Sequence, residues 1–77
     1  MEEKLYRILS EVLKVDPSAI NEESSPDNIA SWDSFNGLIM VTELEKSFNV
    51  KFTMEEIMLV RTVRDIKESL RRHGVKI

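Results

Sequence analysis

The absence of cysteine from this 77-residue chain constrains its fold more than any other feature of the sequence. No disulfide can cross-link the chain, and no thiolate can bind a metal ion or act as a nucleophile. The only histidine, His73, cannot build a histidine metal site alone, so we expect no metal centre. The fold must therefore depend on burying apolar side chains, which make up 42% of the sequence. The length is enough for one domain, which we expect to span residues 1–77.

Helical spacing accounts for most of these apolar residues. A first helix is expected over about residues 2–14, where the apolar positions follow the i, i+3, i+4, i+7, i+8 pattern: Leu5, Ile8, Leu9, Val12 and Leu13. A second is expected over residues 34–48. A short third helix should start at a capping box, Thr53 to Glu56, and end at about residue 59 or 60. A fourth should start at Thr62 and stop at Gly74. The sequence thus predicts an all-α fold, a small bundle of three longer helices and one short helix.

Residues 15–33 form a long connection between the first two helices. Asp16 and Pro17 indicate a short capped turn, and residues 22–28 are polar and turn-prone. We expect Ile20, Ile29 and Trp32 to hold this loop to the core. Connections of this length are unusual in compact domains and are often functional.

The second helix is apolar on two sides near its start. At about 100° per residue, one side should face the core and carries four residues: Leu38, Val41, Leu44 and Phe48. Phe35 and Ile39 lie on roughly the opposite side. Either the long loop covers these two residues, or they form an exposed apolar contact for a partner.

Charge is distributed unevenly along the chain. Residues 1–60 contain 12 acidic and 5 basic side chains, whereas residues 61–77 contain 2 acidic and 6 basic ones, for a net charge of −3. The acidic body argues against binding of nucleic acid, and the basic end suits the C-terminus of a helix. The longest apolar runs, such as residues 38–41, are far too short to form a transmembrane helix. We expect a soluble, cytoplasmic, monomeric protein.

Ser34 is the most informative residue for function, because it is expected at the N-terminus of the second helix. Such an end presents unpaired backbone N–H groups and a partial positive charge, which suit a phosphate. A hydroxyl there is a candidate covalent anchor for a phosphate-linked group. The alternative is that Ser34 or Asp33 only caps the helix.

Asp33, Ser34 and Phe35 are similar to the Asp-Ser-Leu signature of the acyl carrier protein family, which the chain resembles over nearly its whole length. The second helix also has apolar and acidic residues at the family's positions: Leu38, Val41, Leu44, Glu45 and Phe48. The resemblance implies that a phosphopantetheinyl transferase attaches 4′-phosphopantetheine from coenzyme A to Ser34. Asp33 would then lie near the metal and phosphate during transfer. The arm would carry acyl intermediates as thioesters to acyl-transferring or condensing enzymes of fatty acid, polyketide or related specialised synthesis.

Two departures from the family suggest dedicated partners. Members commonly have acidic residues at the positions of Asn36 and Ile39, so this face has lost two charges and gained an apolar side chain. We therefore expect partner enzymes to dock through Phe35, Ile39 and the remaining Glu43. Four further residues could line a cleft that shelters the acyl chain, or could simply fill gaps in the core: Met40, Leu44, Ile57 and Met58.

Four other functions compare less well with the sequence. An enzyme is not expected, because the single histidine lies far along the chain from Ser34 and no carboxylate pair stands out. An aminoacyl or peptidyl carrier would use the same anchor chemistry. An unmodified helical interaction module, docking through the second helix, would explain Phe35 and Ile39 but not Asp33 and Ser34. Nucleic acid binding would have to use the basic residues near the C-terminus: Arg61, Arg64, Lys67, Arg71 and Arg72.

Overall fold

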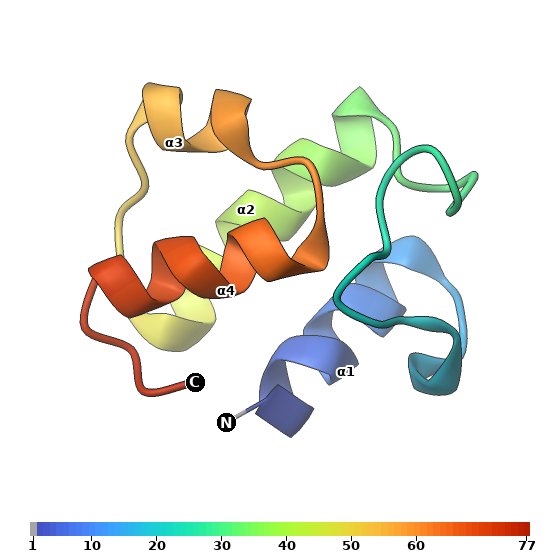
Figure 1. The fold of residues 1–77 in the computed structure, drawn as a ribbon, viewed down its shortest axis with the longest axis horizontal. Coiled ribbons are helices and arrows are strands. Elements are labelled where there is room, and N and C mark those ends of the chain that lie inside the picture. The colour runs from blue at the N-terminus through green and yellow to red at the C-terminus, as the bar shows by residue number, and fades with distance from the viewer. Residues whose placement is uncertain (1) are drawn as a thin grey trace.

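The computed structural model describes residues 2–77 as four α-helices with no strand among them. The helices are α1 (Glu2–Leu13), α2 (Ser34–Phe48), α3 (Met54–Leu59) and α4 (Val63–Arg72), with a 3₁₀ turn at Pro17–Ala19. In Figure 1 the short α3 and the long loop after α1 lie on opposite sides of the view. The all-α prediction, with three longer helices and one short one, is confirmed. None of the helices within residues 2–77 has the length and apolar character that a membrane span requires.

Local signals in the sequence set the helix ends. The predicted capping boxes are both present, Thr53 with Glu56 at the start of α3 and Thr62 with Asp65 at the start of α4. The first helix ends one residue earlier than predicted, because Lys14 adopts a left-handed conformation with φ of 57°. The last helix ends at Arg72, two residues before Gly74.

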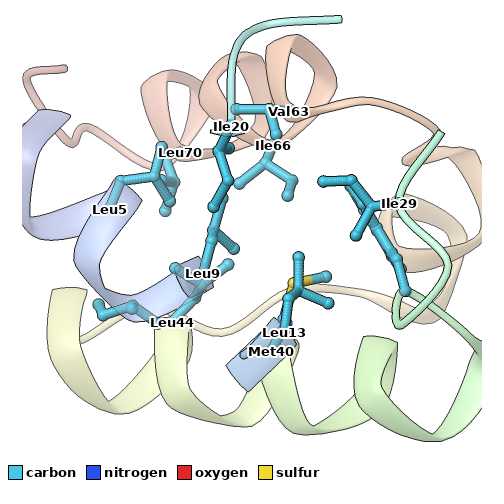
Figure 2. Packing of buried hydrophobic residues seen from close by; sticks show 12 residues of the cluster. Leu5, Leu9, Leu13, Ile20, Ile29, Met40, Leu44, Val63, Ile66 and Leu70 are labelled. Carbon is cyan, nitrogen blue, oxygen red and sulfur yellow. The ribbon is translucent and has the colours of Figure 1, made fainter. Parts of the chain in front are cut away.

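One apolar core joins α1, the long loop, α2 and α4. Figure 2 shows side chains of all four segments meeting there. From the loop, Ile20, Ile29 and Trp32 are buried, as predicted. The buried apolar residues of the helices are Leu5, Ile8, Leu9, Leu13, Met40, Leu44, Val63, Ile66 and Leu70.

The predicted core stripe of α2 is wrong at Leu38, and Val41 also lies outside the core cluster. Leu38 is 60% exposed, whereas Met40, which was not included, is only 3% exposed. The stripe that faces the core runs through Met40, Leu44 and Phe48 at intervals of four residues, and Val41 lies half-buried beside it. Because α2 carries apolar side chains on several sides, its periodicity alone could not fix which line faces inward.

Backbone hydrogen bonds and a buried charged contact hold the long loop against α4. The backbone N–H groups of Val63 and Arg64 donate to the carbonyls of Ser24 (3.1 Å) and Glu22 (3.0 Å). The buried Lys67 ammonium lies 3.0 Å from a carboxylate oxygen of Glu22 and 3.4 Å from one of Glu2. Burial alone would lower the pKa of Lys67, but its hydrogen bonds outweigh burial and raise that pKa. These contacts fix Glu22 and Ser24, in the part of the loop that precedes Trp32 and Asp33.

Candidate functional site

Ser34 is the first residue of α2 and is exposed. Asp33 precedes it as the N-cap, and its Oδ1 accepts a hydrogen bond from the backbone N–H of Asn36 at 2.8 Å. The Asn36 side chain in turn donates to the carbonyl of Ser31 at 2.8 Å. Within residues 2–77, no group accepts a hydrogen bond from the backbone N–H of Ser34 or Phe35. The start of α2 therefore offers a hydroxyl beside two free donors, which suits a phosphate ester.

A largely apolar cleft of about 460 Å³ runs from this site between α2 and α3. Ser34 and Asp33 are among the residues that line it. Four apolar side chains of α2 form one wall: Leu38, Met40, Val41 and Leu44. The other side includes Phe52, Glu56 and Ile57 from the segment around α3. Of the four residues predicted for such a cleft, Met40, Leu44 and Ile57 line it, whereas Met58 is 74% exposed and lies outside its lining.

Glu56 and His73 tie α3 to the end of α4. The His73 Nε2 lies 2.9 Å from a Glu56 carboxylate oxygen, and the His73 ring packs edge-on against Phe52 with centroids 5.3 Å apart. The backbone N–H of Thr53 bonds to Glu56 and lowers its pKa, and His73 adds to the effect. His73 is the C-cap of α4, and its contact with α3 is not predicted by the sequence. No local pattern signals a contact between residues 17 positions apart.

A second hollow of about 410 Å³ lies between α1 and the opposite side of α2. All three residues predicted for partner docking, Phe35, Ile39 and Glu43, line this groove. From α1 it is lined by Ile8, Glu11 and Val12, with Lys14 beyond the helix end. Phe35 is 71% exposed, so the long loop does not cover it. We call this hollow the α1–α2 groove.

Comparison with known proteins agrees with this geometry. Residues 3–70 match the family described as a phosphopantetheine attachment site. An acyl carrier protein from Thermosynechococcus vestitus (strain NIES-2133 / IAM M-273 / BP-1) is 31% identical over 64 residues, which are 83% of this chain and 79% of that protein. The chain belongs to the acyl carrier protein family.

Membership of this carrier family defines the cofactor, a covalently attached 4′-phosphopantetheine. Proteins of the family do not catalyse reactions themselves, and they interact with phosphopantetheinyl transferases and acyl-handling enzymes. The residues at the start of α2 fit this cofactor. The exposed Ser34 hydroxyl is suited to an ester bond, and the two free backbone N–H groups beside it are suited to the charge of a phosphate. The apolar cleft adjoins this position.

Proposed function

We propose that Ser34 is the attachment residue and that the protein carries acyl intermediates as thioesters on its 4′-phosphopantetheine arm. The observation that carries this proposal is the exposed Ser34 hydroxyl at the first position of α2, beside an apolar cleft. When bound, the arm supplies a thiol, which this cysteine-free chain lacks. The residues at the site then hold the phosphate and leave the distal arm free to move.

The other serines are poorer candidates. Ser24, Ser25 and Ser69 are buried. Ser10 is also buried and donates to the carbonyl of Arg7 at 2.8 Å. Of the less buried serines, Ser18 donates to Asp16 at 2.7 Å and Ser31 donates to the carbonyl of Leu13 at 2.7 Å. Ser47 is half-buried in the last turn of α2, at the end of the helix that disfavours a phosphate. Ser34 combines exposure with a helix N-terminus, and the surrounding donors favour a phosphate only there.

Asp33 has two roles in this proposal. One carboxylate oxygen caps α2 and keeps Ser34 at the first helical position. The exposed carboxylate also lies next to the hydroxyl, where it can help to bind a metal ion and orient the incoming phosphate during transfer.

We propose further that the α2–α3 cleft shelters the cargo and that the α1–α2 groove receives partner enzymes. The mostly apolar lining of the cleft favours an acyl chain over a charged aminoacyl group. In the groove, Phe35 and Ile39 provide an apolar surface next to Ser34, with Glu43 at its edge. An enzyme docked there, such as an acyl-transferring or condensing enzyme of fatty acid, polyketide or specialised synthesis, would sit next to the arm.

The attachment residue is tested by intact mass. The protein is incubated with coenzyme A, magnesium and a broad-specificity phosphopantetheinyl transferase. We expect a gain of one phosphopantetheinyl group, complete loss of that gain in Ser34→Ala, and no loss in the matched control Ser18→Ala. A gain that persists in Ser34→Ala would refute attachment at Ser34. No gain with several transferases would favour an interaction module that docks through Phe35 and Ile39.

A further inference from the structure

Trp32 has an indole N–H that no group in residues 2–77 accepts. The residue is only 7% exposed, and buried tryptophan usually finds a partner for this donor. Every fully buried side-chain nitrogen or oxygen in residues 2–77 does have a partner. The indole nitrogen must therefore be reached by solvent, and Trp32 lines the α2–α3 cleft. A donor without a protein partner thus opens into the cleft close to Ser34.

Gly37 lies beside this donor and has no side chain that could extend over it. It also lines the cleft, three residues after Ser34 in α2. A Cβ added at Gly37 would meet no atom closer than the Trp32 Nε1, at 3.8 Å, which is an ordinary contact. Packing within the protein therefore does not require glycine here. The helix nevertheless contains it, at a cost in stability of about 1 kcal/mol relative to alanine. A side chain longer than alanine would extend over the indole N–H.

We propose that the Trp32 indole N–H donates a hydrogen bond to a carbonyl oxygen of the 4′-phosphopantetheine arm or its cargo. The inference rests on attachment at Ser34. Carbonyl oxygens occur in the two amides of the arm and in the thioester that joins it to the cargo. Glu56, another polar residue of the cleft, offers a carboxylate, whose oxygens accept hydrogen bonds and so cannot serve a carbonyl. A donor in a largely apolar cleft fixes the orientation of a ligand.

Trp32 is the only tryptophan, so its indole ¹H–¹⁵N signal is unique in an NMR spectrum. We would record this signal for the unmodified, arm-bearing and acyl-loaded forms of the unaltered chain, with intact mass confirming each form. A hydrogen bond of about 1 kcal/mol should slow exchange of the indole proton with solvent about five-fold and move its resonance downfield. A change on addition of the arm identifies an arm amide, and a change only on acylation identifies a carbonyl of the cargo. An indole signal and exchange rate that stay the same in all three forms would overturn the proposal.

Gly37→Ala and Gly37→Leu form a matched pair for the same measurement. Alanine leaves the indole N–H open, so its signal should respond to loading as in the unaltered chain. Leucine covers the N–H, so the response should disappear while Ser34 still gains the arm by mass. An equal response in both variants would contradict the proposal. Absence of the mass gain in the unaltered chain would instead refute attachment itself, so the two failures are distinguishable.

Discussion

Lys67 shows how one residue can position a site that it does not touch. Its ammonium is buried among Glu2, Glu22 and the Tyr6 ring, whose centroid lies 5.0 Å away. A buried charge is tolerated only when it is paired and hydrogen-bonded. The network joins α1, the long loop and α4. It therefore restrains the position of the loop that leads to Trp32 and the cleft. This cation was a candidate for nucleic acid binding, but its burial leaves it unable to reach a phosphate backbone.

Lys67→Met should destabilise the fold by about 2 kcal/mol, because methionine preserves the packing of the stem but leaves Glu22 without its ammonium partner. Urea unfolding measures the change. Arg64→Met is the matched control, since Arg64 also pairs with Glu22 but its side chain is 52% exposed. We expect that control to lose much less stability, because solvent screens an exposed pair. Equal losses in the two variants would contradict a special role for the buried ammonium.

Among the elements, α3 has few anchors. Its six residues include none that is buried, and its first turn is fixed by the capping box and by the contact between Glu56 and His73. Short helices gain little from their own hydrogen bonds and depend on such tertiary contacts. Because α3 borders the cleft, we expect these contacts to limit how readily the cleft can widen.

The anchoring of α3 should weaken in acid. The folded pKa of Glu56 is below its usual value of 4.5, so its stabilising contribution is complete above pH 4.5 and is lost as the pH falls through the folded pKa. Measured relative to the intrinsic rate at each pH, hydrogen exchange of the α3 amides should therefore accelerate below about pH 4.5. Glu56→Gln retains an acceptor for the capping box but removes the charge facing His73, so this acceleration should be absent. The same acid dependence in both proteins would show that another carboxylate is responsible.

The elements also show what the sequence could predict. The capping boxes and the apolar stripe of α1 depend on residues within four positions of each other, so they were found from local pattern. Periodicity places Leu38 in the core because α2 is apolar on several sides. Only packing against α1 and α4 determines that the side with Met40 faces inward. The contacts of Lys67 with Glu22 and of His73 with Glu56 join distant residues of ordinary surface type. Such pairs carry no signal in periodicity or spacing.

At the scale of the whole molecule, α2 separates two hollows, and each is lined in part by the first turn of that helix. The cleft toward α3 holds apolar side chains and the open indole N–H, whereas the α1–α2 groove presents Phe35 and Ile39. This arrangement allows a partner enzyme to dock on one side of α2 while the cargo rests on the other. Docking in the groove would then leave α3 free to move as the cargo departs.

The groove is tested by introducing a charge on each side of α2. Phe35→Glu and Ile39→Glu should each lower the rate of acyl transfer with the native partner enzyme about ten-fold, because each removes roughly 1.5 kcal/mol of apolar contact. Leu59→Glu, which places the same charge on an exposed position of α3, should change the rate much less. Phe35 is exposed, so its variant separates docking from folding, whereas Ile39 is half-buried and its variant also needs a thermal unfolding control. If the transfer rate is unchanged in both groove variants and falls only in Leu59→Glu, partner enzymes dock on the α3 side instead.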